Sequence, residues 1–418
     1  MIADAPRTTR CRVCGNPSLE PCLDLGAQYL SSIFPTDLNY RDTLKRYPMD
    51  LVVCRQESDA HCGLLQMGHH LDLSEMYAAY PYQSSTNSGM RAVLADVAAD
   101  GDRVGGLSAG DVVLDIGCND GTLLSMFSGR GLVLAGIDAA QNIQLVFDDP
   151  ALHHARGYFT RERYETFGIP RARLIFSIAM FYHLDDPVAF ASDAAAVLAP
   201  DGTWIIQMAY AGAMLDTNMY DNIVHEHAGY YGIETLERVL AQAGLAIVDA
   251  SLNDVYGGSY RVFVRHQAAA TTRSVRLEQL LATERAQRLT DAETWRQFGV
   301  RVAETRDALR TEVERVRAEG QTIWVYGAST KGNTILQYCE LSSRELPYAA
   351  DANPFKLGKF LIGSDIPIVD EQALRAARPD ALLVLPYSFV DGFIARETAL
   401  VEGGTRFLVP LPAVHWKP

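Results

Sequence analysis

An apolar run that ends in a glycine turn constrains the fold of this chain more than any other feature. Residues 112–116 read Val-Val-Leu-Asp-Ile, and Gly117 and Gly121 follow closely after Asp115. A buried strand that passes through a tight glycine turn into a helix forms the ligand-binding corner of a doubly wound α/β sheet. Glycine suits this corner because it has no Cβ to hold a ligand away from the backbone. The sequence therefore predicts an open α/β domain with a ligand at this corner.

A second apolar run, residues 132–137, ends in Asp138. Asp138 follows Gly121 at roughly the 20 residues that separate a glycine turn from an acid that contacts ribose hydroxyls. The spacing Asp-x-Gly-x-Asn-x-Gly differs from that of dinucleotide sites and resembles motif I of class I S-adenosylmethionine (SAM) methyltransferases. SAM has no phosphates, so the turn would receive its amino-acid tail. The alternative is a pair of ordinary strand-end acids in another α/β domain. The residues that we expect to hold the cofactor are Asp115, Gly117, Cys118, Asn119, Gly121, Asp138 and Ser177.

Length and charge bound the remaining possibilities. A chain of 418 residues with 48% hydrophobic and 21% charged residues predicts a folded protein of two or three domains. The net charge of −14 and the lack of a Lys/Arg block argue against nucleic acid and anionic membrane as partners. We find no apolar run of transmembrane length and no signal peptide, so we expect a cytoplasmic protein whose cysteines are thiols or metal ligands.

The cysteines concentrate at the N-terminus, where five of the seven fall within the first 62 residues. The knuckle Cys-x-x-Cys-Gly at residues 11–15 can place two thiolates on one tetrahedral ion. His61 could replace one ligand, and Cys22 is a spare candidate. The alternative is a set of reduced, buried thiols. We expect a structural Zn²⁺ held by Cys11, Cys14, Cys54 and Cys62, which would stabilise a module with a thin apolar core.

The middle of the chain continues the α/β pattern. The order of a helix, Leu198-x-Pro200-x-Gly202 and a strand is typical of SAM methyltransferases. Gly244 would end a further helix. The expected elements are strands at 173–178, 203–208, 245–250 and 260–265, with helices at 190–198 and 234–243.

The last part of the chain repeats the theme of a strand, a glycine turn and a helix. Residues 274–319 predict long amphipathic helices that pack on the domains. Residues 322–333 contain Gly327 and then Ser329, Thr330 and Lys331, whose helix N-terminus could hold an anion. Further strands are expected at 348–351 and 381–385. This pattern predicts a second, smaller Rossmann-like domain, and the alternative is a vestigial fold without a ligand. The predicted domains are residues 1–74, 75–267 and 268–418.

Residues 221–227, Asp-Asn-Ile-Val-His-Glu-His, are the densest reactive cluster. They follow the fifth predicted strand and therefore lie at the carboxyl end of the sheet, where open α/β folds bind ligands. In an extended chain, His225 and His227 would share one side and suit a metal ion. The spacing is not His-Glu-x-x-His, and no third ligand with a clear motif lies nearby. We therefore favour acid/base chemistry, in which a carboxylate orients a histidine base; the alternative is a pair of structural histidines.

Two further groups precede or follow predicted strands at the same edge. His183 comes directly after residues 173–178, where a histidine is a cap or a packing residue about as often as a catalytic one. Tyr77, Tyr80 and Tyr82 cluster before the first glycine corner, and two of the three are expected to be packing residues.

These motifs, taken in order, resemble the sugar C-methyltransferase family, which acts on nucleotide-linked keto-deoxysugars. That family joins an N-terminal zinc module, a class I SAM domain and a C-terminal Rossmann-like domain. His-Glu-His together with Gly-Ala-Ser-x-Lys-Gly-Asn is the most specific part of the resemblance. The matching segments are 11–15, 115–121, 225–227, 257–261 and 327–333.

The resemblance implies SAM-dependent methylation of a carbon next to the ketone of a TDP-linked 4-keto-deoxysugar, at C-3, in natural-product biosynthesis. His227 would be the base, oriented by Glu226, while His225, His183 and Tyr82 would hold the sugar or stabilise the enolate oxygen. No metal would enter that step, and a monomer is expected. The residues expected at the substrate are Ser329, Thr330, Lys331, Asn333, Arg261 and Tyr80.

The sequence departs from the family in two places. Val224 stands where many members have Tyr, and the second cysteine pair is more widely spaced than in a standard zinc ribbon. Two alternatives therefore stay open. One is O- or N-methylation of another small molecule, and the other is a zinc-stapled binding protein with a degenerate SAM fold.

Overall fold

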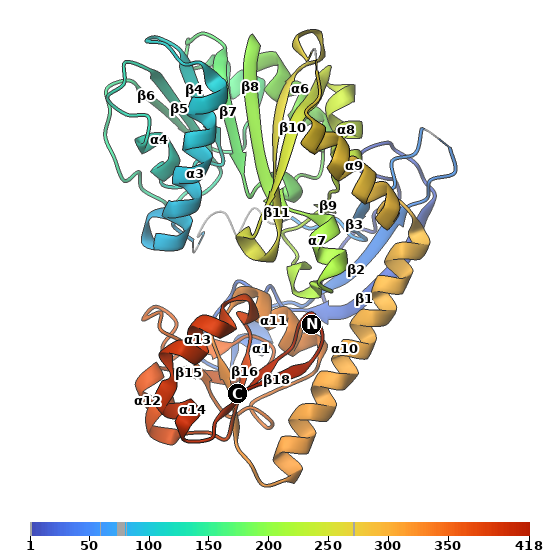
Figure 1. The fold of residues 1–418 in the computed structure, drawn as a ribbon, viewed down its shortest axis with the longest axis vertical. Coiled ribbons are helices and arrows are strands. Elements are labelled where there is room, and N and C mark those ends of the chain that lie inside the picture. Colours follow the sequence, from blue (N-terminus) through green and yellow to red (C-terminus); the bar gives the residue numbers. More distant parts are fainter. Residues whose placement is uncertain (1, 59, 73–79, 81, 271) are drawn as a thin grey trace.

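Three β-sheets organise the part of the chain that the structure, a computed structural model, describes. Residues 2–58, 60–72, 80, 82–270 and 272–418 are described. Tyr77 and the predicted boundary between residues 74 and 75 fall outside them. One sheet has four strands and two have seven, and the small sheet lies between the two larger α/β domains (Figure 1). The predicted α/β class, with a small N-terminal module and a second C-terminal domain, is confirmed.

The small sheet joins the N-terminal module to the middle of the chain. Its strands are β1 (Leu19–Gln28), β2 (Tyr47–Cys54), β3 (Leu65–Met67) and β9 (Gly229–Tyr230), all antiparallel in that order. The short helix α1 (Tyr40–Thr43) lies between β1 and β2 in the sequence. Strand β9 begins two residues after His227 and pairs with β3 through Leu65 and Tyr230. The His-Glu-His segment is therefore anchored to the N-terminal sheet.

The middle domain has the strand order β10-β11-β8-β7-β4-β5-β6, in which β11 alone runs antiparallel to both of its neighbours. All five residues of β4 are buried, as expected for a strand that is covered on both faces. Its strands are β4 (Val112–Ile116), β5 (Val133–Asp138), β6 (Leu152–Arg156), β7 (Ala172–Ile178), β8 (Leu198–Ala209), β10 (Leu245–Asn253) and β11 (Ser259–His266). Its helices include α3 (Ser88–Gly105), α4 (Thr122–Ser125), α5 (Arg161–Glu165), α6 (Pro187–Val197), α7 (Ala211–Asp216) and α8 (Ile233–Gln242).

One predicted boundary in this domain is wrong. The helix predicted at 190–198 ends at Val197, but the strand predicted to start at residue 203 already starts at Leu198 as β8. Leu198 pairs with Ala172 and Thr203 pairs with Leu174, so the intervening residues bulge out of the β7–β8 ladder. Pro200 lies in this bulge, where its missing N–H breaks no ladder hydrogen bond.

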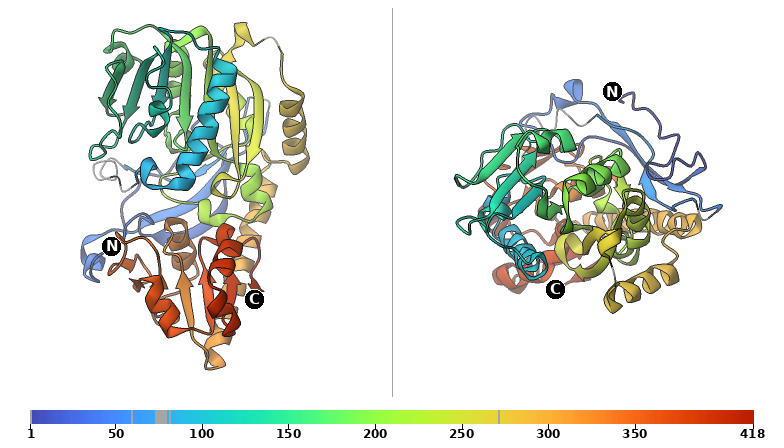
Figure 2. Two further views of the ribbon diagram at one scale, coloured as in Figure 1. Left: turned by 60° about the vertical axis from the view of Figure 1, so that its left-hand side comes forward. Right: turned by 90° about the horizontal axis from the view of Figure 1, so that it is seen from above.

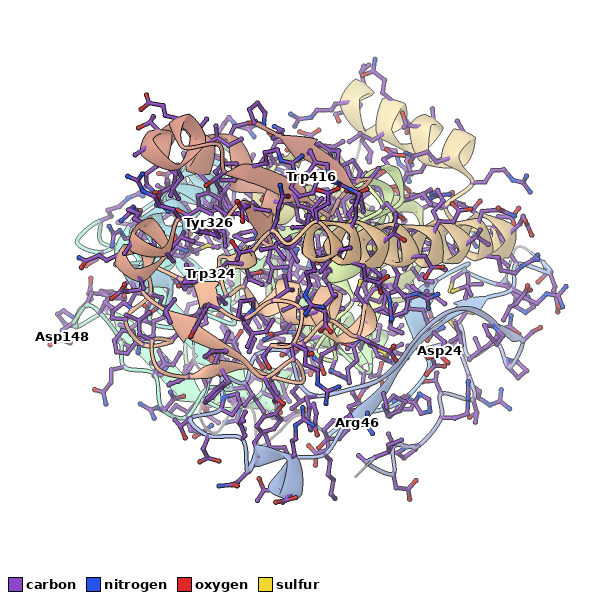
Figure 3. All side chains as sticks on the ribbon, turned by 90° about the horizontal axis from the view of Figure 1, so that it is seen from below. Asp24, Arg46, Asp148, Trp324, Tyr326 and Trp416 are labelled. Atoms are coloured by element: carbon purple, nitrogen blue, oxygen red, sulfur yellow. The ribbon has the colours of Figure 1, made fainter. Side chains whose placement is uncertain are left out.

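The helices predicted at 274–319 are α9 (Val275–Gln287) and α10 (Ala292–Ala318). Helix α10 buries one apolar face, which includes Trp295, Phe298 and Leu309. It runs past the N-terminal strands and along the C-terminal domain to the end that is farthest from the middle domain (Figures 1 and 2). Near its C-terminal end, Glu312 accepts a hydrogen bond of 2.7 Å from Trp416 Nε1. Trp416 is labelled in Figure 3.

The C-terminal domain has the strand order β14-β15-β13-β12-β16-β17-β18, with a parallel core and an antiparallel strand at each edge. Its first strand leads through Gly327 into helix α11, as predicted. Its strands are β12 (Ile323–Tyr326), β13 (Ala349–Ala350), β14 (Phe360–Leu361), β15 (Ile366–Val369), β16 (Ala381–Val384), β17 (Arg406–Val409) and β18 (His415–Lys417). Its helices are α11 (Thr330–Tyr338), α12 (Glu371–Ala377), α13 (Val390–Arg396) and α14 (Thr398–Glu402).

The two α/β domains meet around the carboxyl ends of their strands. Thr334 on α11 donates a hydrogen bond of 3.2 Å to Ile223 O, and Tyr387, after β16, donates one of 3.1 Å to Asp221 Oδ1. Both acceptors belong to the predicted reactive cluster. That cluster therefore lies at the junction of all three parts of the molecule. None of the helices that the structure describes combines the length and the apolar character needed to cross a bilayer.

Candidate active site

The first glycine corner has the geometry of a cofactor site. Gly117 has φ +80°, and a Cβ there would lie 3.1 Å from Met180 Cγ. The Gly117 N–H donates to Ile137 O at 2.8 Å, which ties the turn to the neighbouring strand. The Asn119 N–H donates to Asp138 Oδ2 at 2.7 Å. The turn and the ribose-type acid are thus one hydrogen-bonded unit.

The carboxylates at this corner suit a ligand with positive charge. Burial, together with the nearby carboxylates of Asp138 and Asp120, raises the pKa of Asp115 to about 8. Burial also raises the pKa of Asp138, against two backbone N–H groups that lower it. A sulfonium and an ammonium group would relieve this crowding of negative charge. The residues present therefore fit SAM.

A cavity of about 920 Å³ opens from this corner and is lined by all three parts of the chain. Asp115, Asn119 and Asp138 form its cofactor side, together with Gly117 and Cys118. The N-terminal module contributes Ser32 and His70, and the C-terminal domain contributes Thr330 and Lys331. The predicted reactive residues in the lining are Tyr80, Tyr82, His183, Glu226 and His227.

The His-Glu-His segment is not extended, so His225 and His227 do not share one side as they would in an extended chain. The His227 N–H donates to Val224 O at 3.0 Å, which closes a turn. This turn directs Glu226 and His227 to the cavity, while His225 is absent from the lining residues. His225 Nε2 instead donates to Tyr47 O at 3.2 Å, and its ring packs edge-on against Tyr47. Burial lowers the pKa of His225 to about 4.

Burial favours the neutral form of the His227 imidazole. Its Nδ1 lies 2.8 Å from Asn222 O, and because a carbonyl only accepts hydrogen bonds, Nδ1 carries the proton. The lone pair is then on Nε2. Burial lowers the pKa of His227 well below its usual value, and His183 and Lys331 lower it further. The group that orients His227 is thus a backbone carbonyl, in place of the predicted Glu226.

Glu226 is suited to a different task. Burial raises its pKa, which favours the neutral acid, although a hydrogen bond with Ser32 lowers it. Among the described residues, no hydrogen-bond partner is found for Glu226 Oε2. A neutral carboxylic acid with a buried oxygen on the cavity wall can donate a hydrogen bond to a ligand.

Aromatic side chains complete the wall around His227. The Tyr182 ring centroid lies 4.2 Å from that of His227, and the His183 ring stacks on His227 at 5.5 Å. Burial lowers the pKa of His183 to about 4. Tyr182 and Tyr256, which also line the cavity, were not predicted. Tyr256 has φ +56° before two glycines, and this glycine pair was the one signal of an unusual turn.

Lys331 brings a cation to the cavity from the C-terminal domain. Its Nζ donates to Tyr256 O at 3.0 Å, and burial lowers its pKa while Asp221 raises it. Ser329 instead accepts a hydrogen bond of 3.0 Å from the Gly332 N–H and caps α11. Asn333 donates to Ser31 O at 2.7 Å and is buried. Thr330 and Lys331 therefore line the cavity, whereas Ser329 and Asn333 are structural contacts.

Three other predicted contacts lie away from the cavity lining. Arg261 is buried, with its guanidinium paired to Asp96 at 2.7 Å and also to Asp100. Ser177 is fully buried and accepts a hydrogen bond of 3.1 Å from Trp204 Nε1. A Cβ on Gly121 would meet the Phe147 side chain at 2.8 Å rather than the cavity. Long-range packing, which the local motif does not encode, decides these three positions.

The predicted cysteines come together in the N-terminal module. Their four Sγ atoms all lie within 4.8 Å of one another, close to the roughly 3.8 Å between sulfurs on a tetrahedral Zn²⁺. The Sγ atoms of Cys11 and Cys62 are 3.3 Å apart, and those of Cys14 and Cys54 are 3.5 Å apart. Cys22 lies apart and donates to Leu51 O. The donor set of Cys11, Cys14, Cys54 and Cys62 therefore fits a structural Zn²⁺.

Comparisons with known proteins match all three parts. Residues 11–77 match the family model described as "putative zinc binding domain". Residues 86–250 match a methyltransferase domain, and residues 254–412 match a C-methyltransferase C-terminal domain. The chain is 31% identical to C-methyltransferase NovU from Streptomyces niveus over 96% of its own length and 95% of NovU.

A solved structure of magnesium protoporphyrin IX methyltransferase from Synechocystis PCC 6803 with bound SAH is also similar. It is 17% identical and covers 42% of this chain and 84% of its own, with a TM-score of 0.31. The family models and the match to NovU are decisive. The protein is a SAM-dependent methyltransferase with a structural zinc module, and it belongs to the sugar C-methyltransferase family.

Proposed function

We propose that this enzyme methylates C-3 of a TDP-linked 4-keto-deoxysugar, the carbon α to the ketone, through an enolate. The hydrogen bond from His227 Nδ1 to Asn222 O carries this proposal, because it leaves a neutral Nε2 base in the cavity of the cofactor corner. A C–H bond next to a ketone is acidic enough for such a base when the enolate oxygen is stabilised. Bound SAM would supply an electrophilic methyl group for the carbon.

His227 would take the C-3 proton on Nε2, and the imidazolium that forms would keep its bond to Asn222 O. Depression of the His227 pKa keeps the base unprotonated at neutral pH. The same depression makes the imidazolium a strong acid that returns its proton to water readily after turnover.

The enolate oxygen needs donors on the same wall. Glu226 in its neutral form, His183 and Tyr82 all line the cavity with His227. Burial raises the pKa of Glu226, and its protonated form would donate a hydrogen bond to the developing negative charge. Val224 also lines the cavity and would offer the sugar an apolar contact.

The nucleotide would extend toward the C-terminal domain. Lys331 and Thr330 at the start of α11 offer a cation and a hydroxyl to the diphosphate, while Tyr80 lines the same cavity. We assign residues 1–74 to zinc binding, 75–267 to SAM and the reacting carbon, and 268–418 to the nucleotide. Arg261 has no part in this proposal because its guanidinium is held by Asp96 and Asp100.

Replacement of His227 tests the proposal. His227→Asn should retain SAM affinity and reduce kcat by about 1,000-fold, within the range measured for loss of a general base. In D₂O with SAH bound, NMR should show exchange of the C-3 proton of TDP-4-keto-6-deoxyglucose by the natural enzyme and not by the variant. His225→Asn is the matched control, because His225 contacts Tyr47 outside the cavity lining. Near-normal turnover by His227→Asn, or an acid-labile O-methyl product, would contradict the proposal.

A further inference from the structure

A buried arginine inside the zinc knuckle reaches the wall of the active cavity. Arg12 lies between the ligands Cys11 and Cys14, and its side chain is only 1% exposed. Nη1 donates to Met67 O at 2.8 Å, and Nη2 donates to His69 O at 2.9 Å. A fixed fork of donors on one guanidinium therefore holds the chain that leaves strand β3.

The same guanidinium also reaches the middle domain. Arg12 Nε donates to Asp185 Oδ1 at 3.2 Å, and His70 Nδ1 lies 3.1 Å from the same oxygen. His70 and Asp185 both line the active cavity. One carboxylate oxygen thus joins the knuckle, the N-terminal segment and the cavity wall.

Asp185 in turn belongs to the loop that carries the groups around His227. It follows the short helix η2 (Phe181–His183) directly after β7. Tyr182 and His183 from this helix pack against the His227 ring, with centroids at 4.2 Å and 5.5 Å. Displacement of Asp185 would therefore move residues that contact the proposed base.

We propose that Arg12 is a positioning residue: from inside the zinc knuckle it holds His70 and Asp185 in the wall of the active cavity. The zinc module then shapes the site of the methyl acceptor as well as stabilising its own fold. Arg12 donates to four acceptors in two distant segments: Gln66, Met67 and His69 lie on the first, and Asp185 lies on the second. A residue needed only for the knuckle would have no reason to bind Asp185 in another domain.

The inference rests on the proposed function only for the choice of acceptor. Arg12→Gln should keep about one zinc ion per chain and nearly unchanged SAM affinity by calorimetry, because neither the four thiolates nor the glycine corner is altered. The KM for TDP-4-keto-6-deoxyglucose should rise at least about tenfold, with kcat changed less than about threefold. Arg12→Lys should give an intermediate KM, since one ammonium cannot reproduce the guanidinium fork.

Arg10→Gln is the matched control in the same knuckle. Arg10 is exposed and donates to Gly15 O at 3.0 Å, without contact to the cavity wall. Asp185→Asn removes the same contact from the side of the cavity wall. The Asp185 carboxylate is exposed and is not part of the zinc knuckle. Asp185→Asn should raise KM in the same way, and the double variant Arg12→Gln/Asp185→Asn should exceed Arg12→Gln by less than about twofold, because both remove one shared link.

Hydrogen exchange provides a measurement that needs no acceptor. Backbone amides of residues 66–70 and 181–186 should exchange faster in Arg12→Gln than in the natural enzyme, and at the natural rate in Arg10→Gln. An Arg12→Gln enzyme with natural KM and natural exchange would overturn the inference while leaving the loss in His227→Asn intact. Loss of zinc from Arg12→Gln, or a natural KM in Asp185→Asn, would overturn it as well.

Discussion

The two glycine corners of this enzyme have similar backbone geometry and differ in the side chains that pack over the turn. Gly117 and Gly327 have φ +80° and +85°, and each donates its N–H at 2.8 Å to the neighbouring strand. The Ala328 N–H donates to Asp351 Oδ2 at 2.8 Å, as the Asn119 N–H does to Asp138. The backbone geometry alone therefore does not distinguish the ligands of the two corners.

The side chains that pack over each glycine distinguish the two corners. A Cβ on Gly327 would lie 2.4 Å from Pro386 Cγ, a closer approach than the 3.1 Å to Met180 at the first corner. Lys356 Nζ donates to Ala328 O at 2.8 Å and pairs with Asp351 at 3.4 Å. At the second corner, the Lys356 ammonium group already pairs with the strand-end acid. The first corner has space there for a charged ligand. A glycine motif sets a backbone shape, and the loops of adjacent strands decide whether a ligand can enter.

Removal of the two strand-end acids should give the largest contrast. Asp138→Ala should weaken SAM binding by about 100-fold, because it deletes the acid that faces the cavity. Asp351→Ala should leave SAM affinity unchanged and lower the free energy of unfolding by about 1–3 kcal/mol, since Lys356 and the Ala328 N–H lose a partner. Calorimetry with SAM and urea unfolding measure the two effects. Equal loss of SAM affinity in both variants would show that the corners are coupled.

Replacement of Lys331 and of Lys356, the two lysines near the second corner, should have different effects on the affinity for TDP. Lys331→Met should raise the Kd for TDP about tenfold, because Lys331 lines the cavity and a diphosphate is anionic. Lys356→Met is the control, since Lys356 is held by Asp351 and Ala328 O. Calorimetric titration with TDP compares them. A larger effect from Lys356 would place the nucleotide at the second corner itself.

The smallest expected effect is proton release at the first corner. The pKa of Asp115 is raised to about 8, so at pH 7 its carboxyl group is largely protonated before the ligand binds. A cationic ligand lowers this pKa, and binding of SAM at pH 7 should release up to about one proton. The heat of binding should then differ between buffers of different ionisation enthalpy, and Asp115→Asn should remove the difference. Identical heats in both buffers would contradict this assignment.

Local patterns predicted the parts of the enzyme that depend on contiguous residues. The first glycine corner, Asp138 and the Cys11–Cys14 knuckle follow from spacing, because each feature lies within one turn or at a strand end. The second cysteine pair was also predicted, although its longer loop left His61 and Cys22 as alternatives.

The site residues that the sequence misplaced or missed depend on contacts between distant segments. The turn at Val224–His227 forms where strand β9 joins the N-terminal sheet, so His225 faces Tyr47 and Asn222 O takes the place predicted for Glu226. Arg261 looked like a phosphate ligand because its motif says nothing of Asp96 and Asp100, which belong to α3. Tyr182 and Tyr256 could not be told from packing residues without the cavity that they line.

Strand β9 has a consequence for engineering chimaeras of such enzymes. Gly229 and Tyr230 pair with Leu65 and Gln66 directly after the proposed base. A transplanted middle domain would leave that loop without its hydrogen-bonded neighbour, so a hybrid built at domain borders would lose its reactive centre. Residues 11–70 and 220–232 should therefore be inherited together as one cassette.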